Sequence, residues 1–102
     1  MTTPLFDEII HAPNRLQICA MLAAVESAEF ATIRDTLDIS DSVLSKHLKV
    51  LQTAGYVAAQ KTSGKAPRST WLSLTGRGRK ALAGHLAELR RIADLADLGT
   101  DR

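Results

Sequence analysis

The chain has 102 residues, which is enough for a single domain built on one hydrophobic core and too few for a second. Its 13 basic and 11 acidic side chains leave a net charge of only +2, and its single cysteine excludes an intrachain disulfide and a zinc site made of several thiolates. No apolar run approaches the roughly 20 residues that cross a bilayer and the N-terminus lacks the features of a signal peptide, so we expect one cytoplasmic domain, residues 1–102, with no membrane partner.

The first third of the chain predicts short helices. Pro4 suits the first turn of a helix over residues 4–11, and Pro13 suits the first turn of a second helix. Two apolar stripes on the second helix predict that it is buried on two sides. Residues 29–31 then indicate a strand with a single bridge, and Thr32 is expected to cap a short third helix.

A fourth helix is predicted from Asp41 to Ala54, with Ser40 as its N-cap and Gly55 at its C-terminal stop. Helical spacing gathers three leucines on one side, which must face the core: Leu44, Leu48 and Leu51. The opposite face is polar, cationic or small and has no carboxylate: Ser42, Ser45, Lys46, Lys49, Gln52 and Thr53. Such a face can lie against base edges and phosphates without like-charge repulsion.

After Gly55 the apolar residues alternate as they do in strands. Two strands, within residues 57–60 and 70–74, are joined by a hairpin whose tip, residues 61–68, combines turn residues with three cations. Thr75 can cap a last helix over residues 76–98. Its apolar stripe is long enough to pack on a partner helix as well as on its own domain: Leu82, Leu86, Leu89, Ile92, Ala93, Leu95 and Ala96.

The basic residues are concentrated in the middle of the chain. Residues 42–80 contain no Asp or Glu, and eight cations lie among them: Lys46, Lys49, Lys61, Lys65, Arg68, Arg77, Arg79 and Lys80. An uninterrupted basic segment is typical of a surface that meets phosphates. The alternative is a solvated face whose carboxylates come from elsewhere in the fold, and on charge alone nucleic acid is favoured over it.

Three segments of the chain carry recognisable motifs: H-A-P-N-R-L-Q-I-C-A-M-L (residues 11–22), S-D-S-V-L-S-K-H-L-K-V-L-Q-T-A-G-Y-V (residues 40–57) and W-L-S-L-T-x-x-G-R (residues 71–79). They resemble bacterial transcriptional regulators of the MarR-like and ArsR-like winged helix-turn-helix group. The first resembles the second helix of these regulators, the second their recognition helix and following strand, and the third their wing strand and the start of their final helix. The likeness covers nearly the whole chain and is strongest to compact stand-alone regulators. The fold expected is mainly α with a small β-hairpin (α+β), about five helices and a two- to three-stranded antiparallel wing sheet.

The resemblance implies a dimeric regulator, expected to be a repressor, that binds double-stranded DNA with one helix in the major groove of each half-site, about 34 Å apart. By position, the candidates for groove contacts are Ser42, Ser45, Lys46 and Lys49, and those for phosphates or the minor groove are Lys61, Lys65 and Arg68. His47 is a further candidate, although it lies beside the leucine stripe, where a structural hydrogen bond is favoured over a base contact.

We expect dimerisation through the two terminal helices, residues 4–11 and 76–98, because both carry surplus apolar positions. The residues predicted to contribute are Leu5, Phe6, Ile9, Leu86, Leu89, Ile92 and Leu95.

Other functions find less support in the sequence. Cys19 has no second thiol, and His85 with Glu88 is a single pair, so we expect no metal and no cofactor. A small-molecule effector is possible but unsupported. No Gly-rich phosphate loop or catalytic spacing indicates an enzyme, and residues 75–79 are explained by a capped helix start. A winged helix that contacts only proteins is the remaining alternative, and the acid-free basic segment argues against it.

Overall fold

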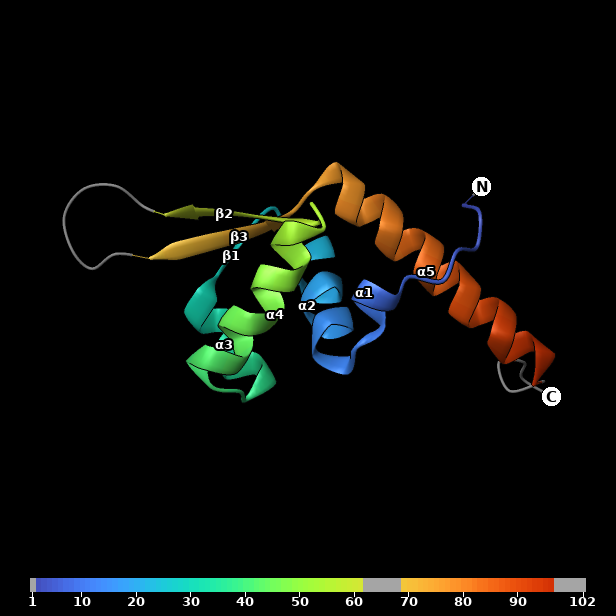
Figure 1. Ribbon diagram of the computed structural model, residues 1–102, viewed down its shortest axis with the longest axis horizontal. Helices are drawn as coiled ribbons and strands as arrows, with labels where there is room; N and C mark the ends of the chain where they lie inside the picture. The colour runs from blue at the N-terminus through green and yellow to red at the C-terminus, as the bar shows by residue number, and fades with distance from the viewer. Residues whose placement is uncertain (1, 62–68, 97–102) are drawn as a thin grey trace.

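The computed structural model describes residues 2–61 and 69–96, which form five helices and one three-stranded sheet (Figure 1). In chain order the elements are α1 (Glu8–His11), α2 (Pro13–Ala23), β1 (Ala28–Glu29), α3 (Phe30–Leu37), α4 (Asp41–Thr53), β2 (Val57–Lys61), β3 (Thr70–Leu74) and α5 (Gly76–Leu95). The sheet is antiparallel with the order β1-β3-β2. The predicted fold class is confirmed.

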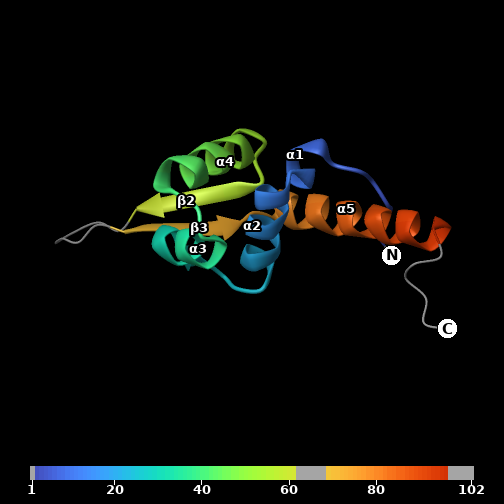
Figure 2. The same ribbon diagram turned by 90° about the horizontal axis from the view of Figure 1, so that it is seen from below.

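One face of the sheet packs against the hydrophobic core. β3 pairs Leu72 with Ala28 on one side and with Ala59 on the other, and its inward side chains Leu72 and Leu74 are buried. α3 and α4 lie on the two sides of the hairpin when the molecule is seen from below (Figure 2), and α5 extends away from the sheet as a separate arm. The alternation of buried and exposed side chains on β3 is the period-2 pattern that predicted the strand.

One cluster of apolar side chains joins every helix to the sheet. Its buried members are Ile10, Ile18, Cys19, Leu22, Ile33, Leu44, Leu48, Leu51, Val57, Leu72, Leu74 and Leu82. α2 contributes Ile18, Cys19 and Leu22 from a single side, whereas Ala20 and Ala23 of the helix, and Val25 just after it, are exposed. The prediction that α2 is buried on two sides is therefore wrong, because its outer side meets solvent.

The predicted helix over residues 4–11 is shorter in the structure and begins at Glu8. Asp7 is its N-cap, and the carboxylate oxygen Oδ1 accepts hydrogen bonds from the backbone N–H groups of Ile9 and Ile10 at 2.9 and 3.0 Å. Residues 2–7, which we call the N-terminal strap, run along α5 instead, where the N–H of Leu5 donates to the carbonyl of Gly84 at 2.9 Å. A strong Asp cap and a long-range backbone bond outweigh the preference of Pro4 for a first turn.

Other predicted boundaries have mixed outcomes. Ser40 and Thr75 are the N-caps of α4 and α5, as expected. Thr32 is not a cap, since α3 already begins at Phe30, directly after the two residues of β1. α5 ends at Leu95 rather than at residue 98, and residues 97–102 lie outside the described part of the chain.

Asp7 joins three elements. Besides capping α1 it accepts a hydrogen bond from the hydroxyl of Tyr56, which follows α4, at 2.5 Å through Oδ2. Its own backbone N–H donates to Nδ1 of His85 on α5 at 2.9 Å. The N-terminal strap is thus tied to both the end of α4 and the middle of α5.

His85 is fully buried, and both ring nitrogens have partners. Nδ1 accepts from Asp7, so the neutral ring carries its proton on Nε2, which donates to Nδ1 of His11 at 3.1 Å. The ring of Phe6 packs on both imidazoles. Burial, and then the neighbouring His11, lower the pKa of His85, while Asp7 and Glu88 oppose this shift.

The start of α5 packs against the chain that follows α4 with almost no space. The hydroxyl of Thr75 donates to the carbonyl of Gly55 at 2.7 Å, and its N–H donates to the carbonyl of Tyr56 at 2.9 Å. A Cβ on Gly78 would lie 2.2 Å from that same carbonyl oxygen. Only glycine allows this approach of the two backbones.

We therefore predict that Gly78→Ala lowers the free energy of unfolding by at least about 2 kcal/mol, because backbone must shift to admit the methyl group. Gly76→Ala is the matched control, since nothing lies within 4 Å of its Cβ position. This second change should stabilise the helix by roughly 0.5 kcal/mol. Urea unfolding of both variants measures the difference, and equal stabilities would contradict the close contact.

The state of His85 predicts a dependence of stability on pH. Because its pKa is lowered in the folded chain, the unfolded chain binds protons more readily, so stability falls as the pH drops below the ordinary histidine value of about 6.5. In His85→Asn the amide oxygen can still accept from Asp7 but does not titrate. Urea unfolding between about pH 7 and pH 5 should show a shallower decline for the variant. His47 also has a lowered pKa and is present in both proteins, so parallel declines would contradict the role given to His85.

Candidate nucleic-acid interface

α3 and α4 form a helix-turn-helix through a connection of three residues. Asp38 adopts the left-handed conformation (φ 54°, ψ 52°), which reverses the chain directly after α3. Ser40 then caps α4, its hydroxyl accepting from the N–H of Val43 at 3.2 Å. Local chemistry at both helix ends therefore fixes the turn.

The rotation of α4 about its own axis is set by its leucines. Leu44, Leu48 and Leu51 are buried in the core. The predicted groove face consequently points outward, and each of its members is exposed: Ser42, Ser45, Lys46, Lys49, Gln52 and Thr53. The structure thus brings the four groove candidates together on one surface, which we call the α4 face.

Arg34 on α3 forms an ion pair with Asp41, the carboxylate at the N-terminal end of the α4 face. The guanidinium of Arg34 lies 2.9 Å from Oδ1 of Asp41, the first residue of α4, and 2.9 Å from Oδ1 of Asp35. These hydrogen bonds raise the pKa of Arg34. The ion pairs are exposed and so contribute little to stability, but they offset the negative charge at the N-terminal end of the α4 face. This role could not be predicted from the sequence, because Arg34 and Asp41 lie on different helices.

His47 is turned toward α2 and contacts two of its side chains. Its Nδ1 lies 3.3 Å from the guanidinium nitrogen of Arg15, and its Nε2 lies 3.5 Å from the amide nitrogen of Asn14. Burial lowers the pKa of His47, followed by the charges of Arg15 and Lys46, so the ring is neutral at pH 7. This geometry favours the structural hydrogen bond, and a base contact by His47 stays a prediction.

The hairpin carries only one of the predicted wing contacts within the described residues. Lys61 is exposed at the end of β2, where it pairs with Thr70 of β3. β2 and β3 project past α3 and α4 at the left of Figure 1. Lys65 and Arg68 lie outside the described part of the chain.

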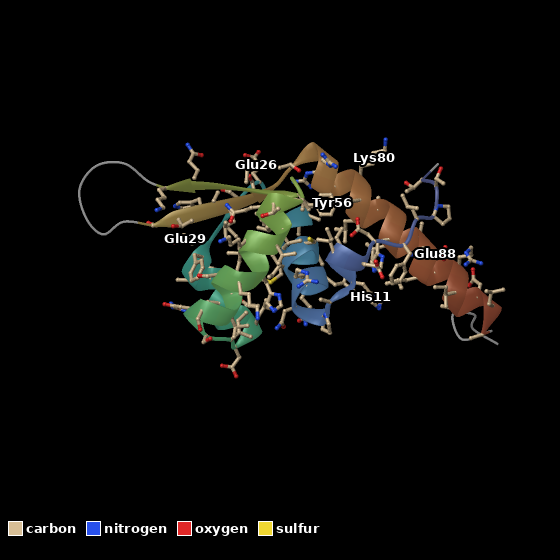
Figure 3. All side chains as sticks on the ribbon, in the orientation of Figure 1. His11, Glu26, Glu29, Tyr56, Lys80 and Glu88 are labelled. Atoms are coloured by element: carbon tan, nitrogen blue, oxygen red, sulfur yellow. The ribbon has the colours of Figure 1, made fainter. Side chains whose placement is uncertain are left out.

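The remaining cations of the basic segment lie elsewhere. Arg77, Arg79 and Lys80 belong to the first turns of α5, at the end of the hairpin opposite to Lys61. The guanidinium of Arg79 donates to the carbonyl of Ala23, the last residue of α2, at 3.1 Å and to that of Val25, just beyond the helix, at 3.3 Å. Figure 3 shows Lys80 at the upper edge of the molecule, while α4 extends downward. The acid-free segment of the sequence is therefore divided between two surfaces.

Within residues 2–61 and 69–96, no three His, Cys, Asp or Glu side chains gather in a way that could hold a metal ion. Cys19 is buried, and burial above all raises its pKa to about 11, which keeps it a thiol at neutral pH. None of the described helices has the length and apolar character needed to span a bilayer.

Comparison with known proteins gives matches along most of the chain. A family model described as a winged helix DNA-binding domain matches residues 14–93. An uncharacterized protein of Methanocaldococcus jannaschii is 29% identical over 86 residues, which cover 84% of this chain and 94% of that protein.

Solved structures show the same arrangement. A transcriptional regulator homologue from Pyrococcus horikoshii OT3 superposes with a TM-score of 0.84 at 30% identity, over 90% of this chain and 91% of that one. ZitR of Lactococcus lactis, described as a zinc-responsive MarR family member, superposes with a TM-score of 0.64 at 26% identity, over 93% of this chain and 67% of that one.

Proposed function

The chain belongs to the winged helix DNA-binding domain family and shares the fold of MarR-family regulators, and from this premise we propose that it binds a specific double-stranded DNA operator as a homodimer and represses transcription. The resemblance expected from the sequence is confirmed at the level of fold and family. We further propose that it acts in the cytoplasm and without catalysis, as a binding protein for DNA.

The observation that carries the proposal is the α4 face. It is exposed, has no carboxylate and carries Lys46 and Lys49 between small hydroxyl side chains. An α-helix of this kind fits the major groove, where hydroxyls and ammonium groups can donate to base edges and phosphates. We propose that Ser42 and Ser45 contact bases, and that the two lysines contact bases or the backbone beside them.

The hairpin supplies a second set of contacts in this proposal. Lys61 lies at the described end of β2, and Lys65 and Arg68 follow in the connecting segment of the sequence. Cations in a wing neutralise phosphates or enter the minor groove, and this raises affinity without reading sequence directly. The wing thereby holds α4 in register on the duplex.

The proposed dimer interface consists of the N-terminal strap and the outer side of α5. Leu5 and Leu95 are 70% and 75% exposed, and Phe6 and Ile92 are 41% and 42% exposed. The strap, rather than a helix, brings Leu5 beside α5. Leu86, Leu89 and Ile9 are half-buried, with Leu86 and Ile9 packing partly on the chain's own core. Exposed apolar side chains gathered at one end of a small domain favour a second copy as their partner.

The DNA proposal predicts how affinity responds to salt. Duplex binding should weaken steeply as salt rises, and Lys46→Ala or Lys49→Ala should reduce the slope of log affinity against log salt by roughly one unit if the lysine contacts a phosphate. Lys80→Ala removes the same charge from the start of α5 and is the control. Fluorescence anisotropy with duplex fragments selected from the source genome measures all three.

Two results would count against this account. Equal slopes for Lys46→Ala, Lys49→Ala and the wild type would remove these lysines from the interface. Absence of duplex binding at low salt would instead favour the protein-interaction alternative.

The dimer proposal predicts the effect of placing charge on its apolar surface. Replacing Ile92 and Leu95 together by Glu should convert the dimer to a monomer, because the buried carboxylates would lose their water. Val25→Glu places a charge on another exposed apolar residue and should leave the dimer intact. Sedimentation equilibrium at micromolar concentration measures the mass, and a wild-type mass of one chain would contradict the proposal.

A further inference from the structure

One carboxylate borders the α4 face at the end where the helix begins. Asp41 is the first residue of α4, and 70% of its side chain is exposed. It lies one helical turn before Ser45, so the two side chains are neighbours on the same side of the helix. The N-terminal residues of a recognition helix are the ones that reach base edges. A duplex that contacts Ser45 therefore also meets Asp41.

The ion pairs around Asp41 leave this end of the helix-turn-helix with a net negative charge. The guanidinium of Arg34 is shared between the carboxylates of Asp35 and Asp41, each at 2.9 Å, and no other described cation pairs with either of them. One positive charge thus faces two negative charges. A net negative charge beside a DNA-contacting face lowers affinity for every duplex, because it repels phosphates. Only a hydrogen bond from a base to the carboxylate compensates for this repulsion.

Arg34 restricts the movement of the Asp41 carboxylate. Its Nε donates to Oδ1 of Asp35 on α3, and its Nη1 donates to Oδ1 of Asp41 on α4. The carbonyl of Arg34 also accepts from the N–H of Ile39, at 3.2 Å, within the turn between the two helices. Its neighbour Ile33 is fully buried and anchors α3 in the core. Arg34 therefore joins α3 to the start of α4 through its backbone and its side chain.

The second carboxylate oxygen of Asp41 is open. Nη1 of Arg34 occupies Oδ1, and none of the described residues donates to Oδ2. An ionised carboxylate has lone pairs and no proton to donate. Oδ2 can therefore pair with a base that presents a donor in the major groove, and it repels a base that presents only acceptors there.

Cytosine presents the group that fits this oxygen. In the major groove its only hydrogen-bonding group is the N4 amino donor, whereas guanine shows the acceptors O6 and N7 and thymine shows the acceptor O4. Adenine has an amino donor at N6 but also the acceptor N7 beside it, which repels a carboxylate. A fixed carboxylate at the start of α4 thus favours cytosine over the three other bases.

We propose that Asp41 is a specificity-determining residue that accepts a hydrogen bond from the N4 amino group of one cytosine in each half-site. Arg34 is the positioning residue that holds the carboxylate for this contact. The assignment rests on the proposed function, because it requires α4 to lie in the major groove. It deepens that function, since the cations of the α4 face and the wing attract any duplex, whereas Asp41 selects one by its sequence.

Selection of bound duplexes from a randomised pool tests the contact. The full-length wild-type chain should require cytosine at one position of each half-site. With Asp41→Asn this position should change to adenine, because an amide can accept from N6 and donate to N7. With Asp41→Ala the preference at this position should be lost, while the other positions keep their bases.

Asp38→Asn is the matched control. It removes a carboxylate from the same turn, and asparagine tolerates the left-handed conformation that Asp38 adopts (φ 54°). The side chain of Asp38 has no ion pair with Arg34. The requirement for cytosine should therefore be the same as in the wild type.

Fluorescence anisotropy measures the size of the preference and the part played by Arg34. Replacing the selected C·G pair by T·A should weaken wild-type binding roughly tenfold and leave binding by Asp41→Ala unchanged. Arg34→Gln should reduce the preference to roughly threefold, because the carboxylate is present but no longer held. In the Asp41→Ala background, Arg34→Gln should not alter the preference at all. A purely structural role of Arg34 would instead weaken binding to both duplexes equally.

The outcomes distinguish this assignment from the DNA-binding function on which it rests. If the wild type selects a defined sequence and Asp41→Ala keeps every preference, the role of Asp41 is wrong while DNA binding stands. A wild-type preference for another base at the position that responds to Asp41 overturns the choice of cytosine, and a full preference in Arg34→Gln overturns its positioning role. Failure of the wild type to bind any duplex overturns the proposed function and this assignment together. Binding of each variant to unselected duplex at low salt shows that it is folded.

Discussion

The burial of Leu44, Leu48 and Leu51 is the constraint on which the rest of the molecule depends. These leucines occupy one side of α4, so placing them in the core leaves the helix only one rotation about its axis. That rotation turns the carboxylate-free side outward beside the hairpin. Burial of these leucines therefore stabilises the domain and, at the same time, orients the surface proposed to enter the major groove. His47 reinforces this orientation from the edge of the leucine stripe through its contacts with Arg15 and Asn14.

At the other end of the molecule, Asp7 holds several elements in place relative to one another. Its side chain caps α1 and accepts from Tyr56, and its backbone donates to the buried His85. One residue thus connects the N-terminal strap, the end of α4 and the helix proposed to form the dimer. The proposed DNA and dimer surfaces consequently meet in one network of packed elements, while each remains open to a separate test.

Local signals made much of the fold predictable. The ends of the helices are set by residues that interact with near neighbours in the sequence: Ser40, Gly55 and Thr75. The leucine spacing of α4 depends only on helical geometry. The helix-turn-helix and the groove candidates could therefore be predicted from the sequence. The absence of a helix over residues 4–7 could not be predicted in this way, because this segment is held along α5 by hydrogen bonds between residues far apart in the sequence, from Leu5 to Gly84 and from Asp7 to His85. The separation of the basic segment into two surfaces could not be predicted either. It arises because Lys61 lies at one end of the hairpin of β2 and β3, whereas Arg77 and Lys80 follow its opposite end.

Site-specific cross-linking tests the central claim about α4 most directly. Ser45→Cys places a thiol on the α4 face, whereas Glu26→Cys places one at the upper edge of Figure 3, above the sheet. The native Cys19 is buried and remains a thiol, so it is protected from the photoreactive reagent that labels the introduced cysteines. After irradiation with a bound duplex, the account predicts a covalent DNA adduct from position 45 and little from position 26. An adduct from position 26 with none from position 45 would contradict it.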